Sequence, residues 1–301
     1  MRDFFLQGTT GNHSRVPISE AEFRAVQQAR GILHHFLSIT ETYRVVVESY
    51  RGVELSKHNA ELDSILSSKF AYRSSLDTRV LLNCAIVSYL SSTRLFLDST
   101  DRLLQIVLDE ASVNKYQEIK KVLYDGSAEY RFIEALRNYV QHKALPVHHL
   151  TYHGFVEDKA DIPNSDLVTA LSIRANRESL RKDGKFKTAA LEGLPELIDI
   201  IEALRLHMEG MWRLHEHILE HHADVAKEAR ARIEECIQRF VTQTGESALG
   251  LQAIACGKDS EEQEVVHLVL EWDDARIAAI KELGNLSKLH RSYISGKIQK
   301  T

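Results

Sequence analysis

Three polar side chains near the end of one predicted helix have residue types suited to chemistry on a phosphate group. They are Arg137, Asn138 and His142, in the stretch FIEALRNYVQHKALP, which closes at Pro146. An imidazole with an ordinary pKa of about 6.5 exchanges protons near neutral pH. A guanidinium binds a phosphate through two parallel hydrogen bonds, and an amide can orient either group. The set therefore combines a proton acceptor with an anion binder.

A helical wheel places these residues together on the polar side of the helix. Arg137 and His142 fall at the two edges of the polar arc, and Asn138 lies one turn before His142. The opposite arc is apolar and is expected to face a core; it contains Phe132, Ile133, Ala135, Leu136, Tyr139 and Val140. The alternative interpretation is a solvated face, on which a histidine near the helix C-terminus merely favours the helix dipole.

This arrangement resembles the signature of the HEPN (higher eukaryotes and prokaryotes nucleotide-binding) superfamily. That signature is an arginine, four to six residues and then a histidine, near the end of a bundle helix, and Asn, Asp or His often follows the arginine. Arg137, Asn138 and His142 match it at spacing four, and LLNCAIVSYLSSTRLFLDST resembles the long partner helix of such bundles. The resemblance covers roughly residues 20 to 150.

The resemblance implies a metal-independent endoribonuclease that needs no cofactor and acts on single-stranded RNA as a homodimer. His142 would be the general acid/base, Arg137 the phosphate stabiliser and Asn138 the positioning group. A toxin or phage-defence role with a protein regulator would follow from family tendency. Some members carry a tyrosine two residues after the histidine that an antitoxin modifies, but Ala144 stands there in this chain. Other members are inactive, so a non-catalytic module for dimerisation or sensing is the alternative.

A second candidate site lies in the histidine-rich stretch WRLHEHILEHHADV. His217, Glu220 and His221 spell H-x-x-E-H, in which two histidines one helical turn apart can bind zinc and the glutamate can act as a base. A metallohydrolase is therefore a second alternative function. The other interpretation is a polar helix face along a helix–helix seam, because the sequence offers no recognisable third ligand.

Basic residues gather in the segment RANRESLRKDGKFK. This segment either contacts RNA phosphates or is a solvated linker. Its candidate RNA-binding residues are Arg174, Arg177, Arg181, Lys182, Lys185 and Lys187.

Residue periodicity predicts a mainly α protein in which a helical bundle precedes a smaller α+β segment. Residues 1–18 are expected to form an N-terminal arm and residues 19–146 the HEPN-like bundle, whose first helix is capped by Ser19 and Glu22. Residues 147–301 would hold a long helix at about 196–242 and one small sheet. Its predicted strands are VHHLTY, LVTALSI, LGLQAIAC and VVHLVLEW, the first two separated by a loop at 157–166.

Composition points to a cytoplasmic location. The 301 residues carry a formal charge of −5, so nucleic-acid binding would depend on local basic patches. Cys84, Cys236 and Cys256 form no C-x-x-C pair, which fits a reducing compartment. The N-terminus lacks a signal-peptide pattern, and the longest apolar run, VLLNCAIVSYL, is too short to span a bilayer, so no membrane partner is expected.

Overall fold

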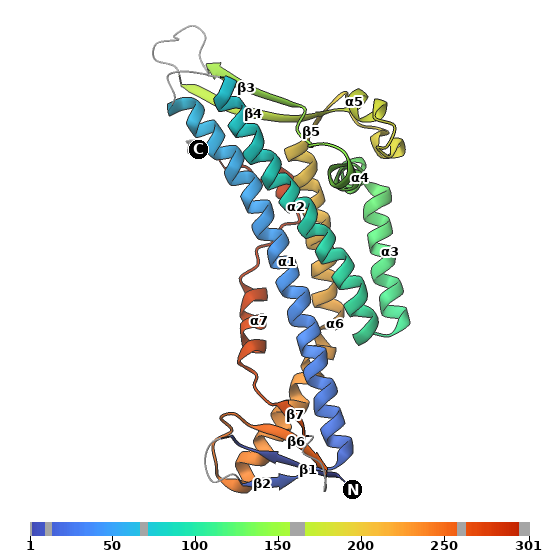
Figure 1. Cartoon of the computed structure of the whole chain (residues 1–301), viewed down its shortest axis with the longest axis vertical. Helices are drawn as coiled ribbons and strands as arrows, with labels where there is room; N and C mark the ends of the chain where they lie inside the picture. The colour runs from blue at the N-terminus through green and yellow to red at the C-terminus, as the bar shows by residue number, and fades with distance from the viewer. Residues whose placement is uncertain (1, 10–13, 67–71, 157–165, 258–262, 295–301) are drawn as a thin grey trace, which may run out of the picture. The chain divides into compact units, whose positions relative to one another are not determined.

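The computed structural model describes residues 2–9, 14–66, 72–156, 166–257 and 263–294. The fold is mainly α with smaller β regions, as the sequence predicts (Figure 1). The helices are α1 (Glu20–Leu66), α2 (Tyr72–Val107), α3 (Glu110–Gly126), α4 (Ala128–His142), α5 (Arg177–Lys182), α6 (Ile200–Thr244) and α7 (Glu271–Lys281), with 3-10 turns η2 (Thr188–Leu191) and η3 (Leu289–Arg291).

The predicted capping box starts α1. The Glu22 backbone N–H donates to Ser19 Oγ at 3.2 Å, and the Ser19 N–H donates to Glu22 Oε2 at 2.7 Å. This backbone hydrogen bond, together with Arg239, lowers the pKa of Glu22 to about 2. Local sequence alone therefore determines where this helix begins.

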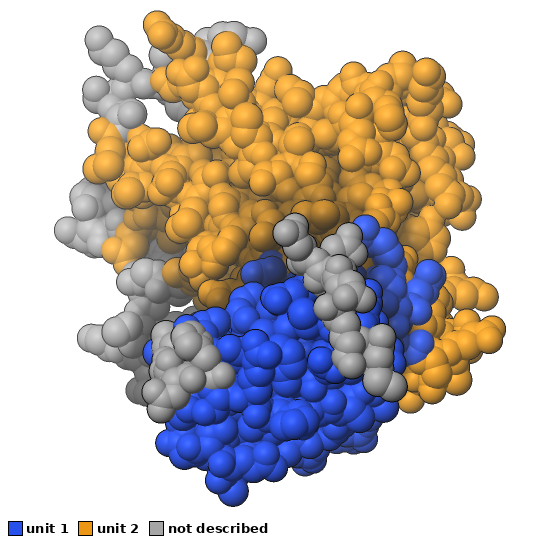
Figure 2. Space-filling view, turned by 60° about the horizontal axis from the view of Figure 1, so that its bottom comes forward, with its two compact units in different colours: residues 1–41, 102–108, 217–284 blue, residues 42–101, 109–216, 285–301 orange. Residues whose placement is uncertain are grey.

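Two compact units divide the chain, and each contains several separate segments (Figure 2). Unit 1 contains residues 1–41, 102–108 and 217–284, and unit 2 contains residues 42–101, 109–216 and 285–301. Helices α1 and α6 each contribute residues to both units. This division does not follow the predicted boundaries at residues 18 and 146.

Unit 1 contains a four-stranded sheet in the order β2-β1-β6-β7. Strands β1 (Arg2–Gln7), β2 (Arg15–Pro17), β6 (Gln252–Gly257) and β7 (Gln263–His267) pair antiparallel, with Phe5 opposite Ile254. Residues 2–7 of the predicted N-terminal arm therefore form an inner strand. The sequence did not indicate this because its partner β6 lies about 250 residues away along the chain.

Unit 2 contains a separate three-stranded sheet in the order β3-β4-β5. Strands β3 (His149–Val156), β4 (Leu167–Asn176) and β5 (Leu197–Asp199) pair antiparallel. Each predicted strand segment contains a strand, but only residues 265–267 of VVHLVLEW are part of one, since Glu271 and Trp272 begin α7. The expectation of one small sheet is wrong, because LVTALSI pairs in this sheet whereas LGLQAIAC and the start of VVHLVLEW pair in the other. The predicted loop between β3 and β4 lies outside the described residues except for Asp166.

The core of unit 2 is aromatic and joins α1, α2 and α6. Tyr43 stacks on His215 with ring centroids 3.9 Å apart, and Tyr43 also contacts Phe96 at 5.6 Å. The first half of the long α6 helix is therefore an internal helix of this bundle.

Helix α2 passes a simple test for a membrane span. Residues 73–107 reach a mean hydropathy of 1.5 in their most apolar window, although the uninterrupted run VLLNCAIVSYL is shorter. Half of that window is buried inside the protein, and Leu82, Ile86 and Phe96 are fully buried. Core helices of folded domains meet the same criterion, so the burial of α2 fits a core helix.

Gly210 brings the backbone of α6 close to a side chain of α4. A Cβ atom there would lie 2.7 Å from Tyr130 Cε2, on α4. We expect Gly210→Ala to lower the free energy of unfolding by about 1–3 kcal/mol through overpacking, despite the better helix propensity of alanine. Gly52→Ala on α1 meets no atom within 4 Å and should be neutral or stabilising. Urea unfolding of both variants tests this, and equal stabilities would contradict it.

His215 makes the stability of unit 2 sensitive to acid. Its side chain is 2% exposed, and burial lowers its pKa from 6.5 to about 3. The unfolded chain binds a proton below about pH 6.5 while the folded chain does not, so stability should fall as pH drops from 6.5 towards 3, by about 1.4 kcal/mol per pH unit.

The variant His215→Phe, which keeps a ring against Tyr43, should lose less stability than wild type between pH 7 and pH 5. Chemical unfolding at both pH values measures the difference, with the exposed His149→Asn as the control. An unchanged pH dependence in His215→Phe would show that this ring is not the sensitive group.

Candidate functional site

Helix α4 carries the three residues of the R-N-x-x-x-H motif. Ser127 Oγ caps its first turn by accepting from the Tyr130 N–H at 3.1 Å. The predicted apolar face is largely buried. Asn138 and His142 are exposed. Within the part of the chain that the structure describes, the His142 imidazole makes no side-chain hydrogen bond or ion pair, so it is available as a proton acceptor.

Arg137 differs from the expectation of an exposed edge, because only 8% of the residue is exposed. Its Nη2 donates to Asn138 Oδ1 at 2.8 Å, and its Nη1 lies 3.3 Å from Glu134 Oε2. Asn138 thus orients Arg137 rather than His142. Among the described residues, the buried Arg137 Nε has no hydrogen-bond partner. The guanidinium is held in place on one side and retains unused donor capacity.

A chain of polar contacts connects Arg137 to the core of unit 2. Glu134 Oε1 lies 3.2 Å from His207 Nε2, and His207 Nδ1 lies 2.9 Å from the Tyr89 hydroxyl. His207 and Tyr89 have no exposed surface. Burial by itself would raise the pKa of Glu134, but the His207 hydrogen bond and the charge of Arg137 outweigh it and lower that pKa. Glu134 is therefore an ionised partner for Arg137.

The last part of the basic segment, residues 183–187, lies alongside α4, although the sequence separates the two by about forty residues. Asp183 accepts a hydrogen bond from the Tyr139 hydroxyl at 3.2 Å and pairs with Lys143 at 3.4 Å. The Phe186 ring lies 5.7 Å from the Tyr139 ring, and Gly193 lies opposite Ala128. Residues 183–193 therefore run antiparallel to α4, from its C-terminal end to its N-terminal end.

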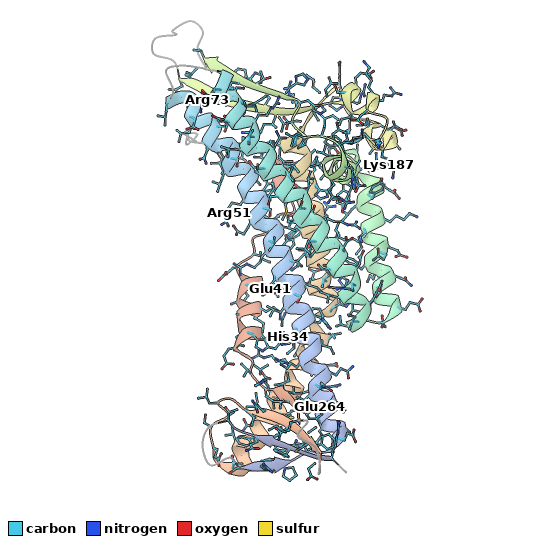
Figure 3. All side chains as sticks on the ribbon, viewed as in Figure 1. His34, Glu41, Arg51, Arg73, Lys187 and Glu264 are labelled. Atoms are coloured by element: carbon cyan, nitrogen blue, oxygen red, sulfur yellow. The ribbon has the colours of Figure 1, made fainter. Side chains whose placement is uncertain are left out.

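The six predicted RNA-binding residues have different surroundings along this segment. Arg177 and Arg181 line a cavity of about 290 Å³ together with Thr188. Lys187 donates to the Tyr124 hydroxyl at 2.7 Å, beside α3 (Figure 3). The remaining residues are Arg174 in β4, Lys182 in an exposed ion pair with Glu178, and the exposed Lys185.

Asn83 fixes the chain just beyond the motif helix. Its Oδ1 accepts from the Val147 N–H at 3.2 Å and its Nδ2 donates to the Arg79 carbonyl at 2.7 Å, in a side chain that is 2% exposed. This buried amide on α2 determines how the chain leaves α4 after Pro146. The sequence analysis missed Asn83, because a single amide on an apolar helix has no distinctive pattern.

The H-x-x-E-H residues do not assemble a metal site. The rings of His217 and His221 lie 4.1 Å apart, but His221 Nδ1 contacts the His217 carbonyl at 3.1 Å, and Glu220 is exposed. Across the described ranges, no group of three or more His, Cys, Asp or Glu side chains is arranged to hold a metal ion. The third ligand that the sequence did not offer is not supplied by the described fold either.

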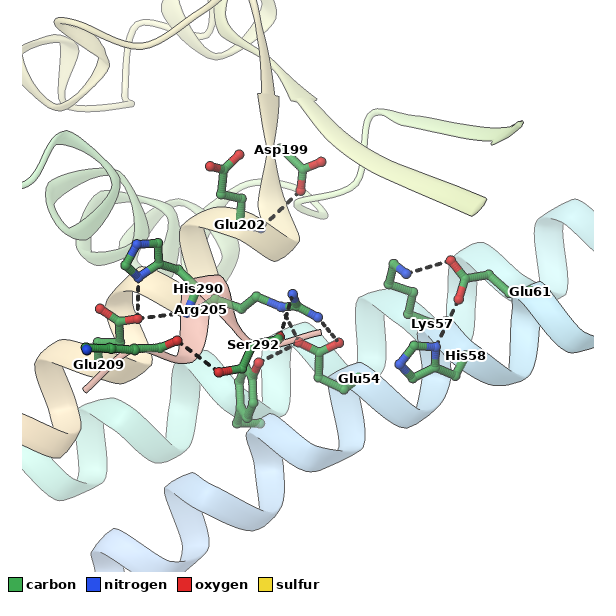
Figure 4. A network of polar contacts seen from close by, with 12 residues as sticks. Glu54, Lys57, His58, Glu61, Asp199, Glu202, Arg205, Glu209, His290 and Ser292 are labelled. Carbon is green, nitrogen blue, oxygen red and sulfur yellow. Dashed lines mark hydrogen bonds and ion pairs between the residues drawn. The ribbon is translucent and has the colours of Figure 1, made fainter. Parts of the chain in front are cut away.

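A second polar cluster in unit 2 holds the C-terminal segment (Figure 4). Arg205 donates to both oxygens of Glu54, at 2.7 and 2.9 Å, and these hydrogen bonds raise the pKa of Arg205. The buried Glu209 accepts from both the backbone and the imidazole of His290. Because Arg205 and Glu54 satisfy each other and Glu209 is hydrogen-bonded to His290, these contacts are suited to holding the chain rather than to binding a charged ligand.

Comparison of the chain with models of known protein families, with characterised proteins and with solved structures finds no match. The case for a function therefore depends on the residues of the site.

Because Arg137 is buried, its removal should affect the stability of the protein. Arg137→Ala leaves the Glu134 carboxylate without its guanidinium partner and with only His207, and should lower the free energy of unfolding by about 3 kcal/mol, the lower end of the cost for breaking a buried pair. His142→Ala should change it by less than about 0.5 kcal/mol, because the side chain is exposed.

Glu134→Gln combined with Arg137→Ala should recover part of the loss, since the buried charge is then absent. Denaturant unfolding of the single and double variants measures this coupling. If Arg137→Ala is as stable as wild type, the guanidinium does not carry the structural role that its contacts indicate.

Proposed function

We propose that the protein is a metal-independent endoribonuclease of HEPN type that acts on single-stranded RNA as a homodimer. The observation that carries this proposal is that residues 183–187 of the basic segment, which include Lys185 and Lys187, lie alongside the helix that bears Arg137, Asn138 and His142. Catalytic residue types on a helix and cations on a neighbouring segment are the two requirements for holding and cutting an RNA strand. On this proposal a toxin or phage-defence role would follow, in the cytoplasm.

The reaction uses the RNA's own 2′-hydroxyl as the nucleophile. His142 accepts the proton of that hydroxyl, and the 2′-oxygen forms a bond to the adjacent phosphorus while the bond to the 5′-oxygen breaks. The leaving 5′-oxygen takes a proton from the second copy of His142, which a two-fold dimer would supply. The products are a 2′,3′-cyclic phosphate and a free 5′-hydroxyl. Neither water nor a metal takes part in this step.

Arg137 and its partners would stabilise the charge that builds on the phosphate. A guanidinium held by Asn138 and Glu134 loses little freedom when it binds an anion, which favours the transition state. Arg181, Lys182 and Lys185 lie in or just after α5, close to Asp183, which contacts the end of α4. Their charges would hold the strand near His142 in a salt-dependent manner.

One observation favours the second candidate, a non-catalytic helical module for dimerisation or sensing. The Nη donors of Arg137 bind Glu134 and Asn138, and the residue is about nine-tenths buried. An arginine in a purely structural ion pair would have the same surroundings. On that interpretation the motif serves to tie α4 to His207 on α6. The two functions differ in what the exposed His142 does.

Purified protein should cut single-stranded RNA in the presence of EDTA and leave 2′,3′-cyclic phosphate ends. His142→Ala should reduce the rate by about 10²- to 10³-fold, the usual effect of losing a positioned acid or base. Gln141→Ala, an exposed neighbour on the same helix, is the matched control. Chromatography of the products and thermal melting of each variant complete the measurement.

The oligomeric state gives an independent check. Light scattering should show a dimer at micromolar concentration, because the second histidine comes from the partner. If wild type cuts no RNA tested, or His142→Ala cuts as fast as Gln141→Ala, the nuclease proposal fails and the dimerisation module takes its place. A monomeric but His142-dependent nuclease would overturn only the shared-site part of the mechanism.

A further inference from the structure

Unit 1 contains a groove whose lining combines apolar side chains with cations. The groove lies between α6 and α7, with Phe36 of α1 in its wall, and has a volume of about 360 Å³. That volume lies within the usual range of small-molecule sites, which are mostly apolar with a few polar groups. The residues that line it belong to unit 1 alone.

Small residues on one face of α6 leave the space that forms the groove. Ala223 and Ala226 follow Ile218 and Leu219 along the same helix face and line the groove with Ile280 of α7. Because alanine side chains end at Cβ, the two helices leave a channel between them at this level. Its walls are mostly apolar, with alkyl side chains and the Phe36 ring beside the His222 imidazole, and they favour an apolar occupant over water.

A rigid cationic clamp lies at one end of the groove. Asp273 has no exposed surface, and its two oxygens accept from Arg276 Nε at 2.7 Å and from Arg230 Nη1 at 2.8 Å. Arg230 is held further by Asp274 at 2.8 Å and by Glu234 at 2.7 Å. Both arginines line the groove, but none of these three carboxylates does. The lining itself is therefore positive, although the three carboxylates behind it outnumber the two guanidiniums.

Lys227 adds a cation to the same end. It lines the groove, it is exposed, and its amine has no ion pair within the ranges that the structure describes. Twelve residues separate Ile218 from Arg230, about 18 Å of helix, so the apolar and cationic ends are well apart. An elongated occupant would place an apolar body against Ile218 and Ile280 and an acidic head near Lys227 and the two arginines.

From this charge and shape we propose that the groove binds a small amphipathic anion, an alkyl chain with a single acidic head group. The head would be a carboxylate or a phosphate, since either accepts hydrogen bonds from lysine and arginine donors. A neutral molecule of the same shape would leave Lys227, which has no ion pair among the described residues, without an anionic partner, and a cationic one would be repelled by it. This site is independent of the R-N-x-x-x-H motif, so neither proposal depends on the other.

Isothermal titration of the full chain with four probes tests the class of ligand. The probes are decanoate, decyl phosphate, decanol and decyltrimethylammonium, each below the concentration at which it forms micelles. Both anions should bind and raise the melting temperature, whereas decanol should bind at least about tenfold more weakly and the cation not at all. Preference for one anion identifies the head group.

Two charge-reversal variants locate the binding site. Lys227→Glu should weaken decanoate binding by about tenfold or more, because the head group loses a cation and meets a carboxylate. Lys281→Glu makes the same change in net charge at an exposed position of α7 outside the lining and should leave the affinity unchanged. Ala223→Leu at the exposed rim fills the channel and should block all probes.

Three results would overturn the proposal. They are the absence of binding by either anion, equal binding of decanol and decanoate, and equal affinities in the two lysine variants. Melting curves of the variants without ligand show whether each one is folded, so a loss of binding can be assigned to the groove. Neither RNA cleavage nor its loss would affect the outcome.

Discussion

The carboxylate of Glu134 connects the motif helix to the rest of its unit. It lies between a buried guanidinium and a fully buried imidazole, on a helix whose other side is packed into the core. A charge in that position is tolerated only when its partners are in place, since an unpaired buried carboxylate is costly. The contacts of Glu134 therefore require α4, α6 and α2 to meet in one arrangement, and Arg137 takes its position from the same requirement.

The proposed nuclease site depends on this arrangement in a second way. Once α4 is fixed, its C-terminal end presents Tyr139 and Lys143 to Asp183, and the aromatic contact with Phe186 aligns the basic segment along the helix. Lys185 and Lys187 then lie on a segment that runs along the helix bearing the exposed His142. In an acidic protein with a formal charge of −5, such a local group of cations is the kind of feature through which RNA binding would occur.

Three of the protein's polar networks differ in how their charges are paired. Around Arg205 the guanidinium pairs with Glu54, and Glu209 accepts from His290, which suits a structural role. In the clamp at Asp273 three carboxylates face two guanidiniums, but the cations line the groove and the carboxylates do not. At Arg137 one side of the guanidinium is paired, and its Nε has no partner among the described residues. In these networks a candidate binding site has cations whose hydrogen-bond donors are not all used by nearby carboxylates, whereas a structural ion pair uses them. The number of charges does not make this distinction.

The sequence by itself determined the features that depend on near neighbours. Periodicity located the long helices, and the Ser19–Glu22 box located the start of α1, because these depend on residues within one or two turns. The R-N-x-x-x-H motif could be recognised from the sequence. The pairing of Glu134 with Arg137 could in principle be predicted too, since side chains three residues apart on a helix are neighbours. The same local patterns identified strand segments but not their partners.

Only the tertiary structure decided which distant residues meet. The partner of β1 lies at the far end of the chain, and one expected sheet became two because strand pairing carries no local signal. His207 and Asn83 are single polar residues on apolar helix faces, and nothing in their neighbours predicts that one contacts Glu134 and the other the chain beyond α4. Burial of Arg137 has the same origin: a helical wheel gives the direction of a side chain, but packing by other helices decides whether that direction leads to solvent.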